Sequence, residues 1–152
     1  MKWANHKLVT TVVVFAGTGN LLYAAYSFLG SVLPDRLEGK PPKESKAYWK
    51  WRSKHRQNTH WTVPYLAIIA VLYYLHEIGI LHDLSWEIAK LPIFVCVGAL
   101  LHILEDGICG KVPLIWRKKK IGIKLFRVGS SWEYFISYTI CLAALYYKFM
   151  LK

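Results

Sequence analysis

The stretch "AGTGN" at residues 16–20 decides how the first apolar segment folds, because two glycines and an asparagine interrupt it. If residues 8–33 form one straight helix, Gly17 and Gly19 are small residues that let a neighbouring helix approach closely. If the chain turns there, the halves form a helical hairpin of about eleven residues each, and each half reaches only ~16 Å. A bent backbone at membrane depth needs cover from other helices. The residues alone leave both interpretations open.

Three further apolar segments follow, at residues 61–81, 88–104 and 134–151. At ~1.5 Å per helical residue, the first, second and fourth segments are long enough to cross a hydrocarbon core of about 30 Å. The third segment is shorter and is expected to span only with tilt or local thinning of the bilayer. The sequence therefore predicts an all-α, polytopic helical bundle in a membrane, with a single domain over residues 1–152.

The composition agrees with a membrane protein. Hydrophobic residues make up 55% of the chain and aromatic residues 15%, which is high for a soluble domain. Seven Trp and ten Tyr suit the aromatic belts at membrane interfaces. The cysteines at 96, 109 and 141 form no CxxC pair and are interpreted as reduced packing residues. The first segment lacks a signal-cleavage pattern, so we expect it to remain in the mature protein.

The net charge of +11 is concentrated in two loops. Residues 36–56 carry eight Lys and Arg, residues 107–132 carry seven, and the short loop between the second and third segments has only Lys90. The positive-inside rule therefore places both long loops in the cytoplasm, where membrane lipid with anionic headgroups is the expected partner. Residues 41–56 interleave aromatic and basic side chains, which favours a helix in the headgroup layer over nucleic-acid stacking on Trp49 and Trp51.

Six polar residues lie at the predicted cytoplasmic ends of the apolar segments: Asp35, His55, His60, His102, Asp106 and Glu133. His102 and Asp106 are four apart, so a helix presents both on one face. His55 fits the incoming loop, and His60 fits the start of the next helix, with Thr59 as its cap. Imidazoles and carboxylates suit Zn²⁺, with Mn²⁺ or another divalent ion as alternatives.

Each of these residues also has an ordinary structural interpretation. A histidine near a membrane interface is commonly an amphipathic side chain, Asp35 after Pro34 suits a turn, and Glu133 suits a helix N-terminus. Their shared location, more than any single residue, favours a metal site. A second polar set near the outer face, His76, Glu77, His82 and Asp83, lacks the H-E-x-x-H spacing and is interpreted as interfacial.

Five segments occur in the order typical of one bacterial inner-membrane family: "NHKLVT" (5–10), "GSVLPD" (30–35), "HRQNTH" (55–60), "HILEDGICGKVPLIWRKKKIGIKLF" (102–126) and "GSSWEYFI" (129–136). The chain resembles the YdjM-like family of LexA-regulated metal-dependent hydrolases over nearly its whole length. The resemblance adds His6 to the candidate ligands. The order of the ligands is also similar, more distantly, to that of zinc-dependent phospholipases C and related single-strand nucleases, which bind several zinc ions.

The resemblance has two structural consequences. A straight first helix would leave His6 and Asp35 on opposite faces of the membrane, so the resemblance favours the hairpin. The chain also departs from the family pattern: Leu37 replaces a second Asp, with Glu38 beside it, and Gln57 replaces a Gly. Further along, Trp61 replaces a Ser. After the helix that carries His102 and Asp106, "CGK" (109–111) stands where the family has T-x-x-G. The missing Asp implies one metal fewer, replacement by Glu38, or a degenerate site.

The resemblance implies a membrane-bound, metal-dependent hydrolase in the bacterial inner membrane with its site facing the cytoplasm, and a phosphoesterase is the expected activity. The expected cofactor is Zn²⁺, as one to three ions, held by His6, Asp35, His55, His60, His102 and Asp106. Glu133 and His55 are the candidate catalytic residues, as a base or as orienting groups. The substrate would be a phospholipid or another anionic phosphoester. The alternative is a non-enzymatic membrane protein with a structural metal site that binds a partner or nucleic acid through its basic loops.

Overall fold

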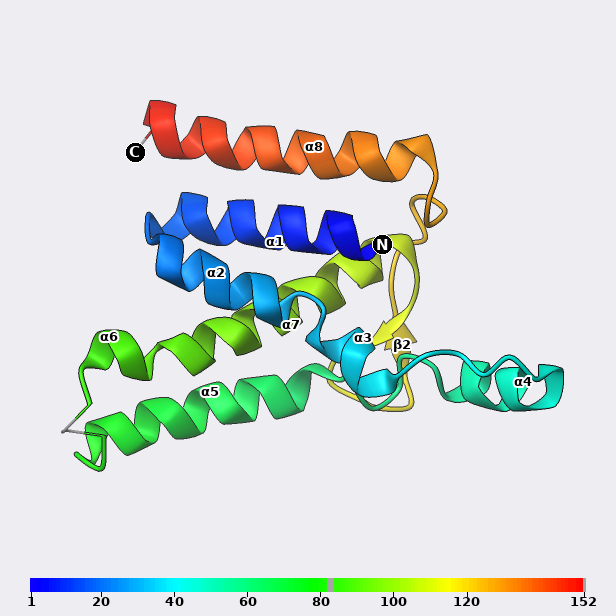
Figure 1. The fold of residues 1–152 in the computed structure, drawn as a ribbon, viewed down its shortest axis with the longest axis horizontal. Helices are drawn as coiled ribbons and strands as arrows, with labels where there is room; N and C mark the ends of the chain where they lie inside the picture. Colours follow the sequence, from blue (N-terminus) through cyan, green and yellow to red (C-terminus); the bar gives the residue numbers. More distant parts are fainter. Residues whose placement is uncertain (82–83, 152) are drawn as a thin grey trace.

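The computed structural model describes residues 1–81 and 84–151, and within them the regular secondary structure is almost entirely helical (Figure 1). The two-residue strands β1 and β2 form an antiparallel pair. The all-α prediction is confirmed. The elements, in chain order, are α1 (Trp3–Thr18), α2 (Leu21–Gly30), α3 (Leu33–Glu38), α4 (Ser45–Lys54), α5 (Thr62–Glu77), α6 (Trp86–Ala89), α7 (Leu91–Cys109), β1 (Val112–Pro113), β2 (Lys120–Ile121), α8 (Ser131–Tyr146) and the π-helix η1 (Tyr147–Leu151).

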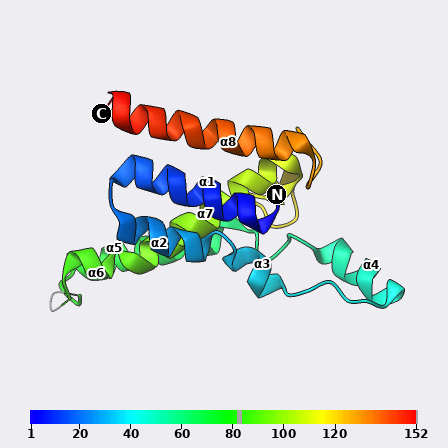
Figure 2. The same ribbon diagram turned by 45° about the horizontal axis from the view of Figure 1, so that its top comes forward.

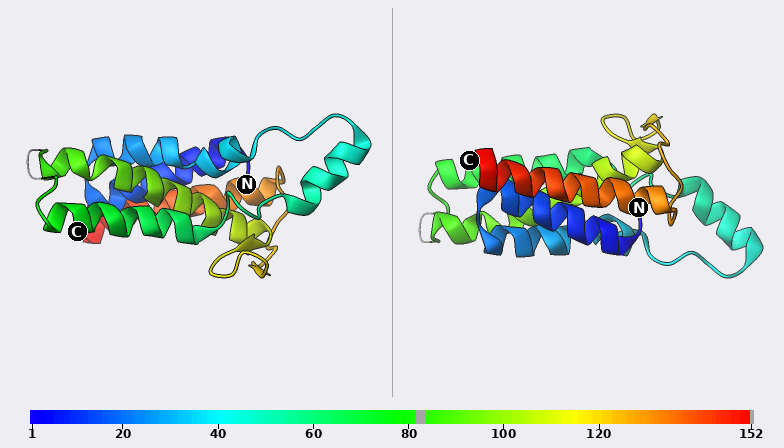
Figure 3. Two further views of the ribbon diagram at one scale, coloured as in Figure 1. Left: turned by 90° about the horizontal axis from the view of Figure 1, so that it is seen from below. Right: turned by 90° about the horizontal axis from the view of Figure 1, so that it is seen from above.

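The first apolar segment turns at Gly19 and Asn20. Gly19 ends α1 with φ 72°, a left-handed conformation that glycine adopts at little cost, and its N–H donates to the Phe15 carbonyl. The Asn20 side chain then caps α2 by accepting hydrogen bonds from the N–H groups of Leu22 and Tyr23. The chain reverses here, and α1 and α2 pack against each other as a helical hairpin (Figures 1 and 3). The hairpin prediction is confirmed.

Helix α7 is the central element, because α1, α2, α3 and α5 all contact it (Figures 1 and 2). Two glycines let α2 and α7 approach at backbone distance. A Cβ on Gly98 would lie 2.1 Å from the Ser27 carbonyl oxygen, and one on Gly30 would lie 2.0 Å from the Val95 carbonyl oxygen. Because α3 follows α2 after only two residues, this close crossing also fixes where α3 lies beside α7.

The helix lengths differ from those expected. The helical stretch Trp86–Cys109 has 24 residues and contains an 18-residue window of mean hydropathy 1.9, and it is the one described stretch long and apolar enough to cross a membrane. This stretch contains the third apolar segment, which we expected to be the shortest. It is longer than expected because the helix continues past residue 104 through buried polar residues to Cys109. The first segment is divided by its turn, and α5 and α8 have 16 residues each. The polytopic arrangement therefore stays a prediction.

Both basic loops and the N-terminus lie at one end of the bundle (Figures 1 and 3). Helix α4 projects beyond this end and has no buried residue. The helical prediction for this stretch is confirmed, whereas its position in a headgroup layer is not tested. The same end carries the start of α1, the whole of α3, the start of α5, the end of α7 and the start of α8 (Figure 1).

Candidate metal centre

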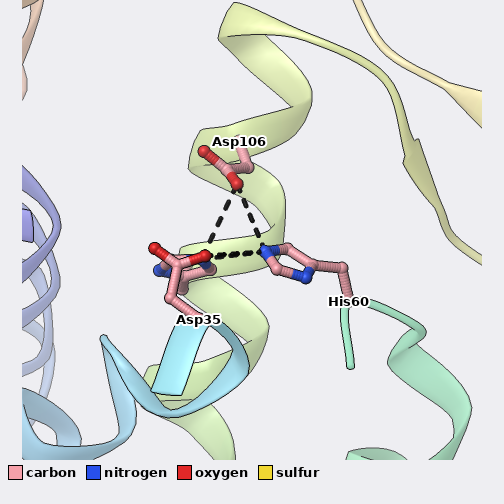
Figure 4. Close-up of side chains that lie close together, drawn as sticks. Asp35, His60 and Asp106 are labelled. Carbon is pink, nitrogen blue, oxygen red and sulfur yellow. Dashed lines mark hydrogen bonds and ion pairs between the residues drawn. The ribbon is translucent and has the colours of Figure 1, made fainter. Parts of the chain in front are cut away.

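Four of the predicted ligands come together at this end of the bundle: Asp35, His60, His102 and Asp106. Each offers one donor atom, and the four atoms lie within 4.8 Å of one another. Asp35 comes from α3, His60 from the turn before α5, and the other two from successive turns of α7. Figure 4 shows the side chains of Asp35, His60 and Asp106 pointing toward one another. The three elements are separated in the sequence, so their convergence is a product of the tertiary structure.

The separations of these atoms fit a tetrahedral ion. His60 Nε2 lies 3.2 Å from His102 Nε2, 3.3 Å from Asp35 Oδ1 and 3.4 Å from Asp106 Oδ2. His102 Nε2 lies 3.6 Å from each of the same two carboxylate oxygens. Four donors placed ~2.0–2.1 Å from a zinc ion are about 3.3 Å apart. The donor set of two imidazoles and two carboxylates, without thiolate, suits Zn²⁺ and also harder divalent ions.

Both histidines are oriented through their other ring nitrogen. His102 Nδ1 lies 2.6 Å from the Ser31 carbonyl oxygen, which can only accept, so Nδ1 carries the proton and Nε2 is left with a lone pair. His60 Nδ1 lies 3.0 Å from Thr59 Oγ1 and 3.7 Å from Glu38 Oε2. Partners of this kind fix the ring orientation of metal-binding histidines. Both imidazoles are fully buried.

Asp35 is positioned by α3 and by Trp3. It lies in the first turn of α3, after Pro34 at a position where the missing N–H of proline costs nothing. Trp3 Nε1 donates to Asp35 Oδ2 at 2.7 Å, which leaves Oδ1 facing the histidines. This tryptophan comes from the first turn of α1, so the hairpin carries an orienting group to the site.

Glu38 lies beside the four-residue cluster. Its Oε1 accepts a hydrogen bond from the Arg56 backbone N–H at 2.8 Å, and its Oε2 lies 2.9 Å from His55 Nδ1. Leu37, which stands where the family pattern has a second Asp, is 63% exposed. Glu38 therefore contacts the histidines from outside the four-atom group. His55 likewise contacts Glu38 and lies outside the group.

His6 lies next to the cluster on the side of α1. Its ring packs against the ring of His102 at a centroid separation of 3.9 Å and a tilt of 31°, and its Nδ1 lies 2.5 Å from Glu105 Oε2. His6 Nε2 lies 3.4 Å from Asp106 Oδ1 and, among the described residues, has no hydrogen-bond partner. The Met1 amine also contacts this oxygen, at 2.6 Å. Asp106 therefore presents Oδ2 to the four-atom group and Oδ1 to His6.

Glu133 is fully buried at the start of α8 and serves the N-terminal segment. Its Oε1 accepts hydrogen bonds from the Lys2 backbone N–H and from Asn5 Nδ2, both at 2.6 Å. Its Oε2 accepts from the Gly129 N–H. The first two donors tie the start of α1 to α8, and the three together account for the burial of this carboxylate.

The charges of the cluster favour ionised carboxylates. Burial raises the pKa of the Asp35 carboxyl, but the imidazoles of His102 and His60 outweigh it, so that this pKa lies well below its usual value. Burial lowers the pKa of His60, but Asp106 and Asp35 outweigh it and raise this pKa above 6.5. The pKa of Glu38 is lowered in the same way, against burial, by His55 and the Arg56 backbone. In the metal-free protein the cluster therefore attracts positive charge.

A pocket of about 340 Å³ adjoins the cluster. This volume is within the range of pockets that bind small molecules. Asp35, Glu38 and His55 belong both to its wall and to the network around the cluster. Two tryptophans and two cationic side chains complete the surface, so that the whole lining is Trp3, Asp35, Arg36, Glu38, Gly39, Lys40, Pro41, Trp51 and His55.

Sequence reasoning missed several groups around the cluster. Glu105 binds His6 and Thr10, Trp3 orients Asp35, and the Arg56 guanidinium lies 2.8 Å from Asp106. Glu105 directly precedes the predicted ligand Asp106 on an apolar helix, and a carboxylate at that position indicates a buried polar partner. The contact between His102 and the Ser31 carbonyl could not be predicted from the sequence, because every residue has a backbone carbonyl.

The described members of the second polar set, His76 and Glu77, lie at the C-terminal end of α5. The ring of His76 stacks on Trp86 with a centroid separation of 3.8 Å. Glu77 ends α5 and is exposed. His82 and Asp83 lie outside the described residues. The described members of this set thus fit an interfacial role.

Comparison with protein-family models gives a match to the YdjM inner membrane protein family over residues 1–151. The match covers nearly the whole chain, and the chain therefore belongs to this family. The resemblance inferred from the sequence is confirmed. No curated protein and no solved structure matched the chain.

Proposed function

We propose that the protein is a membrane-bound, metal-dependent phosphoesterase. One observation carries the proposal: Asp35 is both a member of the four-atom donor group and part of the wall of an open pocket. A metal site that only stabilises a fold has no need of such a pocket, whereas a catalytic site needs a route for its substrate. The cationic side chains of Arg36 and Lys40 line the same pocket and favour an anionic substrate.

The chain supplies the holding and proton-transfer groups. Asp35, His60, His102 and Asp106 would hold the cation, which we propose to be Zn²⁺. A bound divalent ion supplies Lewis-acid chemistry, because it polarises a phosphoryl oxygen and acidifies water. His55 lines the pocket with its Nδ1 toward Glu38, so its other ring nitrogen is the candidate site of proton exchange with the substrate. This arrangement supports His55 over Glu133 as the acid–base residue.

The geometry also bears on the number of ions. Asp106 offers its two oxygens to different partners, and His6 Nε2 faces the second of them. A carboxylate of this kind can serve two cations, and His6 would then hold the second one. We therefore propose one or two ions, with His6 as a ligand only in the two-ion state.

The membrane arrangement is proposed from charge. The family is one of inner-membrane proteins, and both basic loops lie at the end of the bundle that carries the cluster. By the positive-inside rule this end faces the cytoplasm, and the apolar hairpin and α5 enter the bilayer from it. The substrate would then be a phospholipid headgroup or another anionic phosphoester that reaches the cytoplasmic membrane surface.

A second function is favoured by one observation. Four protein donors at tetrahedral spacing are the arrangement of a closed, structural zinc site. In that case the protein is non-enzymatic and binds a partner or nucleic acid through its basic loops. Binding of nucleic acid through those loops would weaken steeply with added salt.

The test uses purified full-length protein in detergent, loaded with Zn²⁺ or Mn²⁺. Metal content is measured together with hydrolysis of short-chain phosphatidate and a soluble phosphomonoester. We expect His55→Ala to keep the metal and lose hydrolysis, and His102→Ala to lose both. His76→Ala, at the opposite end of α5, is the matched control and should keep both. Hydrolysis by the His55→Ala variant at the wild-type rate, or metal without hydrolysis in the wild type, would refute the phosphoesterase.

A further inference from the structure

Arg56 has an unusual backbone conformation beside the cluster. Its φ is 56°, in the left-handed region that non-glycine residues seldom adopt. Its N–H donates to Glu38 Oε1 at 2.8 Å, and Lys120 Nζ donates to the carbonyl of the preceding residue, His55, at 2.6 Å. Such conformations persist where the surrounding structure holds them, and they concentrate at functional sites. The turn therefore aims the Arg56 side chain at a fixed place.

The Arg56 side chain contacts the Asp106 oxygen that faces the other predicted metal ligands. Arg56 Nη2 lies 2.8 Å from Asp106 Oδ2, the same oxygen that belongs to the four-atom donor group. The side chain is 19% exposed, and its Nε is shielded from solvent without a hydrogen-bond partner in the described part of the chain. The guanidinium also lies against Gly110, where an added Cβ would be 2.9 Å from Nη1.

The shared oxygen creates a conflict of charge. A cation held by Asp106 Oδ2 would stand close to a permanently positive guanidinium, and like charges at such distances repel. Arg56 is therefore a poor device for retaining a metal. Two positive charges converging on one place are, however, what a phosphoryl group requires, and the planar guanidinium matches phosphate oxygens with two parallel donors.

We propose that Arg56 binds the phosphoryl group of the substrate next to the metal, an inference that rests on the proposed phosphoesterase function. Without substrate, the guanidinium pairs with Asp106 Oδ2. With Asp106 Oδ2 engaged in holding a cation, the guanidinium would turn its Nε and Nη donors to the phosphoryl oxygens. The chemistry is shared by inorganic phosphate and by the phosphate of a lipid headgroup.

The alternative is that Arg56 only neutralises Asp106. The two roles predict different results for phosphate. A partner that only neutralises Asp106, once removed, leaves phosphate affinity unchanged, and Asp106 keeps the Met1 amine on its other oxygen. A phosphoryl ligand, once removed, relieves repulsion and leaves metal affinity unchanged or higher, while anion affinity falls.

The experiment measures two affinities with full-length protein in detergent. Zn²⁺ affinity is determined by competition with a chelator, and binding of inorganic phosphate and dioctanoyl phosphatidate to the Zn²⁺-loaded protein is determined by calorimetry. We expect Arg56→Gln to hold Zn²⁺ at least as tightly as the wild type and to bind both phosphates about 10- to 100-fold more weakly, the usual range for a lost charged hydrogen bond. Arg52→Gln, on exposed α4, is the matched control and should bind like the wild type.

A second variant keeps the charge and moves the group. Gly110→Ala places its Cβ against Nη1, and the extended backbone of Gly110 is open to alanine. We expect weaker phosphate binding with Zn²⁺ retained. Tighter binding of phosphatidate than of inorganic phosphate identifies a lipid headgroup as the source, and equal binding identifies a soluble phosphoester.

Three results would overturn the inference. They are wild-type phosphate affinity in the Arg56→Gln variant, loss of Zn²⁺ from it to the extent seen in Asp106→Asn, and no phosphate binding by the loaded wild type. Failure of the wild type to hold Zn²⁺ would instead refute the proposed function itself, so the two failures are distinguishable.

Discussion

The two ends of the bundle both carry histidines, carboxylates and aromatic rings, but they use them differently. At the end opposite the metal cluster, Glu87 pairs with Lys90 one turn away and hydrogen-bonds to Tyr23, and the Glu87 side chain is 63% exposed. At the cluster end, donors from α3, from the turn before α5 and from α7 meet, and three of the four are buried. Burial and convergence from distant elements, rather than residue type, distinguish the candidate site.

The largest expected difference between the ends concerns a single carboxylate. Asp106→Asn removes the charge that faces Arg56, His6 and His60 in a buried place. We expect a loss of about 3–5 kcal/mol in the free energy of unfolding, the usual cost of breaking a buried ion pair. Glu87→Gln should leave stability almost unchanged, because exposed pairs contribute little. Denaturant titration in detergent, without added metal, measures both, and equal losses would contradict the distinction drawn between the ends.

The next difference tests whether helix packing sets the site. Gly98→Ala forces a Cβ against the Ser27 carbonyl, so α2 must move away from α7, and α3 must move with it. We expect a loss of about 1–3 kcal/mol and weaker Zn²⁺ binding. Gly107→Ala, on the same helix, meets the Val112 Cγ2 atom at 3.4 Å and should change neither. Wild-type Zn²⁺ affinity in the Gly98→Ala protein would show that the geometry of the site does not depend on how closely α2 packs against α7.

Proton competition offers a further comparison. In the metal-free protein the pKa of His60 is raised above 6.5, so this group favours folding below pH 6.5 and loses that contribution as pH rises through its folded pKa. The pKa of Asp35 is lowered from 3.8, so its contribution is present above pH 3.8 and is lost as pH falls through the folded pKa. Between these values both groups favour the fold.

Zn²⁺ must displace the proton from His60, so Zn²⁺ affinity should fall about tenfold for each pH unit below the raised pKa. Chelator competition between pH 5 and pH 8 measures this slope, with stability of the metal-free protein followed in parallel. An affinity independent of pH in that range would exclude His60 as a ligand.

The smallest expected effect concerns an orienting hydrogen bond. Trp3→Phe removes the Nε1 donor to Asp35 Oδ2 and should weaken Zn²⁺ binding about tenfold, at the low end of the range for outer partners of metal ligands. Tyr23→Phe, which removes a comparable hydrogen bond to Glu87 at the other end, should leave Zn²⁺ affinity unchanged. Equal Zn²⁺ affinity in both variants would show that the hydrogen bond from Trp3 does not contribute to metal binding by Asp35.

Local features of this protein followed from its sequence. Glycine and asparagine at 19–20 allowed a turn as well as a straight helix, and the family resemblance favoured the turn. The spacing of His102 and Asp106 predicts a shared helix face. Residue types alone also selected all four members of the cluster, within a longer candidate set. Such inferences succeed because they depend on conformations within one element.

Only the tertiary structure separated the cluster from the other candidates. His55 and Glu133 look like ligands in the sequence, but the first pairs with Glu38 and the second with backbone N–H groups near the N-terminus. Arg56, a loop cation in the sequence, lies against a buried carboxylate. These outcomes depend on how closely α2 crosses α7 and where the loops then pass. Spacing along the chain fixes directions within a helix, but the distances between helices are set by packing.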